Sequence, residues 1–353
     1  MTMSEEEVVF RSHGALGVIH LNRPRALNAL TREMCVAIRK QLGVWKREAQ
    51  VAAVLIEGAG DRAFCAGGDV VKVARAAQEG RDDWWRFFHE EYRMNSAIAH
   101  FPKPYVAFID GITMGGGVGV SVHGDYRVAT ERTLFAMPET GLGLIPDVGG
   151  THVLPRLPGA TGIYLALTGY RARAADCFYL GVATHVVPSG ALAALRDRLG
   201  TEAGTGGEAV RAALDAAAVD PGDAPLAVHR DAIDRHFSHD SIEAILDSLA
   251  ADASEWAAKT REELMAKSPT SLRLSLAALR RGATLDLDEC LRMEYRIVHR
   301  IMTMDKDFFE GVRALLIDKD KAPKWRPARL ADVDDATIEA HFAGLGEAEL
   351  RLP

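Results

Sequence analysis

The 353-residue sequence lacks any long apolar run, so we expect no transmembrane helix. A helix that spans a bilayer needs about 18 or more consecutive apolar residues, and no stretch approaches that length. Residues 1–7 contain three consecutive glutamates and no apolar core of a signal peptide. We therefore expect neither a secretory signal nor a membrane partner.

Cysteine is also scarce, with four residues in the whole chain. They are widely spaced, and none belongs to a CxxC motif or to a His/Cys ligand pattern. Zinc sites need such close spacing, and small secreted domains need dense pairs of cysteines. The sequence thus predicts a reduced, cytoplasmic chain with no metal site. The cysteines are Cys35, Cys65, Cys177 and Cys290.

An excess of positive charge is absent as well, because the formal net charge is -7. Nucleic-acid binding relies on clustered Lys and Arg that contact phosphates, so we expect no nucleic-acid partner. Apolar residues make up 48% and charged residues 26% of the chain, as in ordinary globular proteins. The length suffices for two domains, or for one large domain with an appendage.

Strand-like and helix-like patterns alternate along the first part of the chain, which favours an α/β fold. Thr31 is a candidate N-cap for a helix that carries apolar residues at helical spacing. A His-Gly-Ala turn joins the first two strand-like runs, which predicts a hairpin. A further helix-like segment covers residues 70–100. The expected strands are residues 8–11, 16–21, 51–57, 105–109, 126–129 and 133–136.

The pattern becomes mostly helical after about residue 155. Long helical stretches are expected at 240–265 and 270–300, followed by a charged tail. Residues 201–225 are small and polar, which is typical of a loose connection. We therefore divide the chain into an α/β core at 1–200, a variable connection at 201–225 and a helical region at 226–353.

Glycine is the one residue type in excess, with 32 in the chain, and the glycines cluster. Gly67-Gly68 and the run from Gly115 to Gly119 each follow a strand-like segment and precede a helix-like one. The first N–H groups of a helix have no internal acceptor, so two such starts could hold a developing oxyanion. Glycines also permit ordinary tight turns, and the clusters alone leave both interpretations open. Neither cluster is a dinucleotide-binding or P-loop motif.

Segments 63–69, 110–119 and 137–139, in this order, resemble the crotonase (enoyl-CoA hydratase/isomerase) superfamily. Within it, the similarity is closer to the 3-hydroxyisobutyryl-CoA hydrolase family. Residues 198–230 match poorly and carry no inference. The matching motifs are residues 22–30, 103–119, 127–131, 135–140, 146–150, 307–314 and 317–325.

The resemblance implies a crotonase-like ββα spiral core with a helical C-terminal region, acting on an acyl-CoA substrate. No separate cofactor is implied, since coenzyme A is part of the substrate. The N–H groups of Gly68 and Gly116 are implied to hold the thioester carbonyl, and Ala26, Ala66 and Asp69 to line the coenzyme A site. Association into trimers or hexamers is also implied.

Carboxylates are the candidates for the chemistry, because a carboxylate can activate water or attack a thioester itself. Glu139 follows Met-Pro at an expected strand end, where burial would raise its pKa. Without the resemblance, Glu139 is equally compatible with a helix-start or surface glutamate, and an Asp after Pro, such as Asp147, is more often a turn residue or an N-cap. The resemblance makes both catalytic and gives Glu91, on an expected helix, a substrate contact. His123 and His152 are interpreted as structural.

Three functions compete at this point. Thioester hydrolysis is favoured, with enoyl-CoA hydration or isomerisation as one alternative and silent acyl-CoA binding as another. Hydratases of the superfamily carry a glutamate three residues after the position of Gly116, where this sequence has Gly119. Retention of Glu139 and Asp147 argues against a silent protein, and Gly119 argues against a hydratase.

Overall fold

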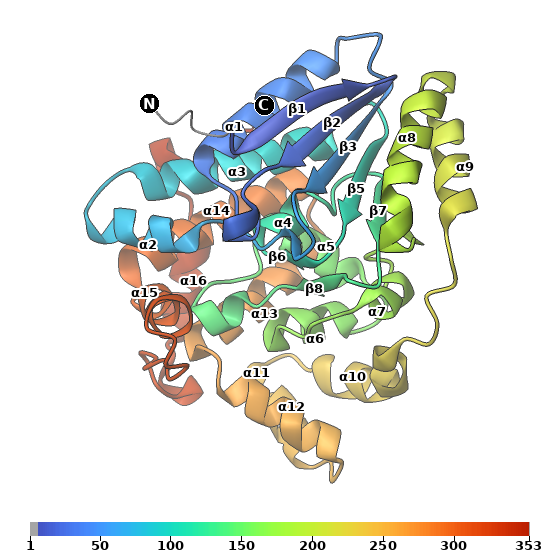
Figure 1. The fold of residues 1–353 in the computed structure, drawn as a ribbon. Coiled ribbons are helices and arrows are strands. Elements are labelled where there is room, and N and C mark those ends of the chain that lie inside the picture. Colours follow the sequence, from blue (N-terminus) through green and yellow to red (C-terminus); the bar gives the residue numbers. More distant parts are fainter. Residues whose placement is uncertain (1–5, 353) are drawn as a thin grey trace.

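Two β-sheets of unequal size lie within the first 190 residues, surrounded by helices (Figure 1). The structure is a computed structural model that describes residues 6–352. The larger sheet has six strands in the order β1-β2-β3-β5-β7-β9. These strands are β1 (Val8–His13), β2 (Leu16–Leu21), β3 (Ala53–Gly58), β5 (Tyr105–Ile109), β7 (Tyr126–Ala129) and β9 (His185–Val186).

The first two strands form the predicted antiparallel hairpin, with Val8 opposite Leu21. Every later neighbour in the six-stranded sheet pairs in parallel. Parallel strands are buried on both faces and therefore read as continuous apolar runs, as β5 does. The predicted α/β class and the predicted strand at 105–109 are confirmed.

The smaller sheet consists of β4 (Ala63–Cys65), β6 (Ile112–Met114) and β8 (Leu134–Ala136), in that order. Both pairs are parallel, so the carboxyl ends of all three strands lie at one edge. Each strand is short and ends where one of the conspicuous sequence motifs begins. This sheet edge decides where the functional groups meet.

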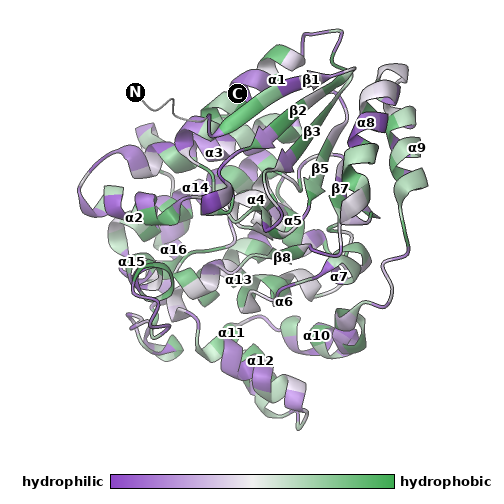
Figure 2. Cartoon of the chain, viewed as in Figure 1, coloured by the Kyte–Doolittle hydropathy of each residue, from purple (hydrophilic) through white to green (hydrophobic). Residues whose placement is uncertain are grey.

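Helices cover both faces of the six-stranded sheet (Figures 1 and 2). Helix α1 (Arg32–Trp45) and helix α3 (Asp83–Ala99) pack together on one side. Thr31 caps α1 as predicted, because its side chain accepts a hydrogen bond from the N–H of Met34. On the other side, α8 (Leu192–Glu202) and α9 (Gly207–Ala217) bury Leu195 and Leu214 against the sheet.

Helix α9 corrects the prediction of a loose connection at residues 201–225. Its buried side chains Val210, Ala213 and Leu214 follow helical spacing, but the surrounding glycines and alanines mask that periodicity. The exposed segment between α9 and α10, at about residue 220, does run without regular structure. The division of the chain at 200 and 226 stays a prediction.

The helices that follow the α8–α9 pair in the sequence are shorter than predicted. The predicted helix at 240–265 is two helices, and so is the one at 270–300, because Ser254 and Asp286 cap new starts. The predicted charged tail contains α-helices at Asp307–Val312 and Asp335–Phe342, with a π-helical segment at Arg313–Ile317 between them. The remaining helices are α2 (Val70–Gln78), α4 (Gly116–Gly119), α5 (Gly150–Val153), α6 (Thr161–Thr168), α7 (Ala174–Tyr179), α10 (Arg230–Phe237), α11 (Ile242–Ala250), α12 (Glu255–Met265), α13 (Pro269–Gly282), α14 (Leu287–Met304), α15 (Asp307–Val312) and α16 (Asp335–Phe342).

None of the helices found within residues 6–352 has both the length and the apolar character needed to cross a membrane.

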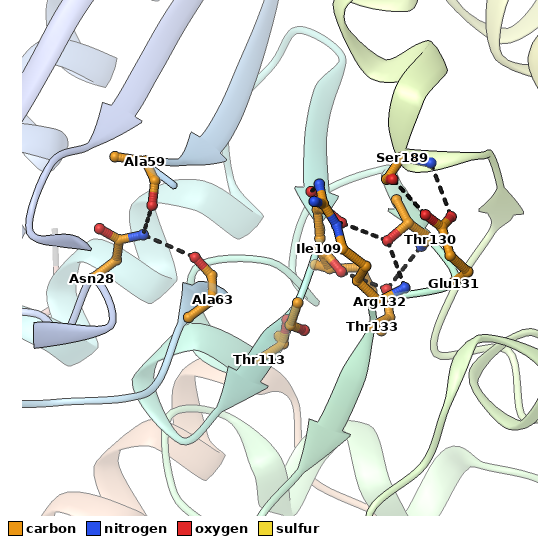
Figure 3. A network of polar contacts seen from close by, with 12 residues as sticks. Asn28, Ala59, Ala63, Ile109, Thr113, Thr130, Glu131, Arg132, Thr133 and Ser189 are labelled. Atoms are coloured by element: carbon orange, nitrogen blue, oxygen red, sulfur yellow. Dashed lines mark hydrogen bonds and ion pairs between the residues drawn. The ribbon is translucent and has the colours of Figure 1, made fainter. Parts of the chain in front are cut away.

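Buried polar side chains fix the two ends of the smaller sheet to the larger one (Figure 3). Asn28 is fully buried, and its Nδ2 donates to the carbonyl oxygens of Ala59 and Ala63, each at 2.9 Å. Near β8, the Thr133 hydroxyl donates to the carbonyl oxygen of Ile109 at 2.6 Å. Because each buried group has a defined partner, the start of β4 and the turn before β8 have little freedom.

Candidate active site

Three sequence motifs lie at one edge of the smaller sheet, because each follows one of its three parallel strands. Gly67-Gly68 follows β4, Gly115-Gly116 follows β6, and Glu139 follows β8. These segments border a cleft of about 380 Å³. Glu91 from α3, Asp147 from the loop after β8 and Arg171 from the segment before α7 complete the charged part of its lining. Its apolar lining includes Leu27, Val70, Phe87, Phe88, Met114, Leu142, Leu144 and Leu316.

Two backbone N–H groups lie close together at the cleft. Gly116 is the first residue of α4, so its N–H has no acceptor inside the helix. A β-bridge joins Leu30 to Gly68, and it uses the groups of Gly67 and Asp69 rather than the N–H of Gly68. A Cβ added at Gly116 would lie 3.2 Å from the nitrogen of Gly68. The two backbone nitrogens are thus close neighbours at the cleft, which is compatible with the predicted oxyanion hole.

Glu139 is buried at the start of a short 3-10 helix (Glu139–Leu142), with 4% of its surface exposed. Within residues 6–352, its Oε2 has no hydrogen-bond partner. Its Oε1 lies 3.0 Å from the position of a Cβ added at Gly115, beside the glycine pair. Burial raises the pKa of Glu139 well above its usual range, and the charge of Asp147 raises it further. A carboxylate so poorly solvated is a strong base once ionised.

Asp147 is also buried, but one of its oxygens is occupied. The Tyr92 hydroxyl donates to Asp147 Oδ2 at 2.6 Å. Burial raises the pKa of Asp147 to about 6, while the hydrogen bond from Tyr92 opposes that rise. The partner of Asp147 comes from α3, the helix that also carries Glu91. Since Tyr92 and Asp147 are 55 residues apart, no local pattern indicates that they meet.

Glu91 is the third buried carboxylate at the cleft, with 2% of its surface exposed. Its Oε1 has no partner among the described residues. Burial raises the pKa of Glu91 well above its usual range, and the charges of Asp147 and Glu139 add to the effect. Three carboxyls around one cleft repel each other when ionised, so the charge on one makes ionisation of the others less favourable.

Not all predicted site residues reach this cleft. Glu139, Asp147, Glu91, Gly68, Gly116 and Ala66 all contribute to its lining. By contrast, Ala26 is exposed on a 3-10 helix (Pro24–Ala26) outside the lining. Asp69 lies outside it too, where it caps α2 and forms an ion pair with Arg23 at 3.1 Å. The placement of Asp69 reflects its local capping role, which the sequence motif did not reveal.

The position of Gly119 has no room for a side chain. A Cβ added there would lie 2.3 Å from Asn95 Nδ2 and 2.7 Å from Val148 Cβ. Asn95 is fully buried on α3, and neither of its amide atoms has a partner within the described residues. A glutamate at position 119 is therefore incompatible with the packing of this cleft.

The two histidines interpreted as structural contact backbone. His123 Nε2 pairs with the carbonyl oxygen of Val148 at 2.7 Å, and burial lowers the pKa of His123 to about 4. His152 Nδ1 approaches the carbonyl oxygen of Leu285 at 3.3 Å. No cluster of three His, Cys, Asp or Glu side chains suited to a metal occurs within residues 6–352.

Comparison with known proteins places the chain in a family. The family model described as enoyl-CoA hydratase/isomerase matches residues 16–342. The protein belongs to this enoyl-CoA hydratase/isomerase family. The crystal structure of a carnitinyl-CoA dehydratase from Mycobacterium thermoresistibile matches with a TM-score of 0.92 and 41% identity, covering 98% of this chain and 99% of the other. The predicted crotonase-like fold of this family member is thereby confirmed.

Curated relatives of this family member carry a more specific name. The 3-hydroxyisobutyryl-CoA hydrolase, mitochondrial, of Xenopus tropicalis is 47% identical over 99% of this chain and 92% of its own length. The protein of the same name from Danio rerio is 47% identical over 98% of this chain and 92% of its own length. The predicted resemblance to this hydrolase family is confirmed.

The same names correct the predicted location. Because these relatives are named as mitochondrial, the prediction of a cytoplasmic chain is wrong. The reasoning failed because free, buried cysteines argue only against an oxidising compartment. Reduced thiols are equally compatible with any reducing compartment, so cysteine usage could not make this distinction.

Proposed function

We propose that the protein hydrolyses 3-hydroxyisobutyryl-CoA to 3-hydroxyisobutyrate and free coenzyme A. One observation carries the proposal: the buried Glu139 carboxyl, with an oxygen that has no partner among residues 6–352, lies beside the N–H groups of Gly68 and Gly116. The names of the curated relatives support it. In this reaction water supplies a hydroxyl to the acyl carbon, the C–S bond breaks, and the sulfur of coenzyme A takes a proton.

The oxyanion hole would act first. As the thioester carbonyl becomes tetrahedral, its oxygen gains negative charge, and the N–H groups of Gly68 and Gly116 stabilise that charge. Glu139 acts either as general base toward water or as the nucleophile that forms a mixed anhydride. A single turnover in oxygen-18 water tests the second route, since label found in the Glu139 carboxyl supports the anhydride.

Hydration of an enoyl-CoA is the competing reaction, and the structural relative from Mycobacterium thermoresistibile is named as a dehydratase. The packing around Gly119 argues against it here, because Asn95 and Val148 occupy the space that a second catalytic glutamate would need. Asp147, which lines the cleft, instead supplies the second acidic group. We therefore favour hydrolysis over hydration for this chain.

Selectivity for a hydroxylated acyl group needs a polar partner in the cleft. A site built to bind a hydroxyl rejects the analogue without it, since its buried polar atoms then lose their partner. Glu91 Oε1 is such an atom, and the oxygen of Asp147 that does not bind Tyr92 is another candidate. Both residues line the cleft together with Glu139. We assign the 3-hydroxyl contact to these two carboxyls.

Several wider predictions accompany this function. The reaction requires no separate cofactor, because coenzyme A is part of the substrate. It places the protein in valine breakdown, where the acid must be released from coenzyme A. Association into trimers or hexamers stays a prediction from the family resemblance.

A single assay separates the competing functions. The protein is incubated with 3-hydroxyisobutyryl-CoA and, separately, with crotonyl-CoA, while free thiol and enoyl absorbance are followed. Thiol release from the first substrate alone supports hydrolysis. Loss of enoyl absorbance alone would overturn the proposal, and no turnover would favour a silent binding protein.

A second assay tests the acyl preference. Isobutyryl-CoA has the same carbon skeleton without the hydroxyl, so we expect its kcat/KM to be at least about tenfold lower. The preference should shrink in Glu91→Ala. Equal kcat/KM values for the two thioesters would defeat the substrate assignment and leave hydrolysis standing.

A further inference from the structure

Glu294 is a buried carboxylate outside the cleft, in the middle of α14, with none of its surface exposed. It accepts three hydrogen bonds from the loop that follows Asp147. Its Oε2 accepts from the N–H of Gly149 at 2.8 Å. Its Oε1 accepts from the N–H of Thr151 at 2.9 Å and from the Thr151 hydroxyl at 2.6 Å. All donors come from residues about 145 positions away, and none comes from its own helix.

The loop held in this way has an unfavourable backbone. Val148 has a φ of +52° and Gly149 a φ of +85°. A β-branched residue such as Val148 rarely adopts the left-handed region, so this conformation persists only where neighbouring groups hold it. His123 Nε2 contacts the carbonyl of Val148 from one side, and Glu294 holds the N–H of Gly149 from the other.

Asp147 immediately precedes these strained residues. Its side chain faces the cleft and meets Tyr92, whereas its own carbonyl oxygen accepts from the N–H of Gly150 within the same loop. The direction of the Asp147 carboxyl therefore depends on the backbone that Glu294 holds.

We infer that Glu294 is a positioning residue, which sets the direction of the Asp147 carboxyl through the N–H groups of Gly149 and Thr151. The catalytic consequence rests on the proposed thioester hydrolysis, but the positioning itself is a property of the structure. Glu294 lies outside the cleft lining, so it acts through the loop and touches no substrate. A C-terminal helix thereby becomes part of the catalytic arrangement of the core.

The main test is Glu294→Ala in the full-length protein. A misplacement of a catalytic group by about 1 Å can cost about 10²-fold in rate, so we expect kcat to fall by about that factor. KM should change less than about threefold, because the contacts to coenzyme A are untouched. A purely structural role would instead lower the fraction of active protein without separating kcat from KM. Active-site titration of the folded fraction distinguishes these results.

Matched variants sharpen the test. Glu294→Gln keeps one acceptor oxygen but places an NH2 group against the N–H donors of the loop. Its kcat should therefore lie between those of Glu294→Ala and the unmodified protein. Thr151→Val removes the hydroxyl donor and keeps the shape, and should lower kcat by about threefold to tenfold. Thr151→Ser restores the hydroxyl and should recover most of that loss. Glu289→Gln, on an exposed turn of the same helix, is the control and should leave kcat unchanged.

A crystal structure of Glu294→Ala provides a readout independent of activity. We expect the hydrogen bond between Tyr92 Oη and Asp147 Oδ2 to lengthen or break. A folded Glu294→Ala with unchanged kcat and an unchanged bond would overturn the inference. If that variant does not fold, the Thr151 pair decides, and equal kcat in Thr151→Val and the unmodified protein would overturn it. Failure of the unmodified protein to release thiol would instead reject the proposed function, while the crystal structure still tests the positioning.

Discussion

The two sheets of this protein differ in what they bury. The six-stranded sheet buries aliphatic side chains on both faces, such as Val54 and Ile56 on one and Leu55 on the other. The three-stranded sheet ends in glycines and in Glu139, whose Oε2 has no partner in the part of the chain that the structure describes. A buried polar atom without a partner costs about 1–3 kcal/mol. We therefore expect substitutions in the larger sheet to act mainly on stability, and substitutions at the edge of the smaller sheet to act mainly on catalysis.

The largest effect expected at the smaller sheet is the loss of the Glu139 carboxylate. Glu139→Gln keeps the shape but can neither attack nor accept a proton, so kcat should fall by about 10²–10⁴-fold. KM should change little, because binding through coenzyme A persists. Steady-state kinetics by thiol release measures both. Glu131→Gln, far from the cleft, is a matched control. A lost affinity with kcat intact would make Glu139 a binding residue.

Closing the oxyanion hole comes next. A side chain at Gly116 would meet Glu91 Oε1 at 2.4 Å and approach the nitrogen of Gly68, so Gly116→Val should block the carbonyl site. Loss of oxyanion donors typically costs about 10²–10³-fold in kcat. Circular dichroism should report a folded protein. Full activity in the folded variant would refute the assignment of the donors.

A substitution in the six-stranded sheet should lower stability and leave kcat unchanged. Leu55 is fully buried against α8 and α9, so Leu55→Ala should lower the free energy of unfolding by about 2–5 kcal/mol. Urea denaturation measures the loss, and kcat per folded molecule should stay unchanged. A fall in kcat as large as that of Gly116→Val would break the separation between the two sheets.

The pH profile tests the charges at the smaller sheet. Activity needs ionised Glu139, so kcat/KM should fall as the pH drops through its raised pKa, at a pH above the usual range of a glutamate. The charge of Asp147 contributes to that rise. Asp147→Asn should therefore move the acidic limb to lower pH, whatever its effect on the maximum rate. An acidic limb at the same pH in both proteins would show that Glu139 does not control it.

The smallest expected effect is on stability. The pKa of Glu139 is raised in the folded protein, so its neutral form favours folding below the unfolded pKa, and this stability is lost as the pH rises. Glu139→Gln should therefore be more stable than the unmodified protein at pH 8, by about 0.5–2 kcal/mol. The difference should shrink toward pH 4.5. Thermal unfolding at the two pH values measures it, and a variant less stable at pH 8 would contradict the proposed cost of the buried carboxylate.

Local signals in the sequence predicted much of the core. The strand at Tyr105–Ile109 could be predicted from its continuous run of apolar residues. The cap at Thr31 could be predicted from a hydroxyl residue directly before a helical pattern. The family motifs placed Glu139 and Gly116 at one cleft. Asp69 also matches its motif, yet its side chain lies outside the cleft. It caps α2 and forms an ion pair with Arg23, and both partners are close to it in the fold.

Contacts between distant segments could not be predicted in this way. Tyr92 meets Asp147 across 55 residues, and Glu294 meets Thr151 across 143. No periodicity or spacing indicates such pairs, since each partner lies on an element whose own pattern reports only its burial. The helix breaks before Ser254 and Asp286 were not predicted, for a different reason. Two consecutive amphipathic helices have nearly the same hydrophobic pattern as one long helix.

The packing around Gly119 has an evolutionary consequence. Asn95 and Val148 fill the volume that a glutamate side chain at this position would need. A hydratase-like carboxylate therefore cannot be acquired by one codon change, since overpacking of a tight interior is destabilising unless neighbours shrink at the same time. Gly119, Asn95 and Val148 lie on three separate segments, so the compensating change would have to come from a distant part of the chain. The tight packing around Gly119 thus disfavours the conversion of this cleft to a hydratase-like site by a single substitution.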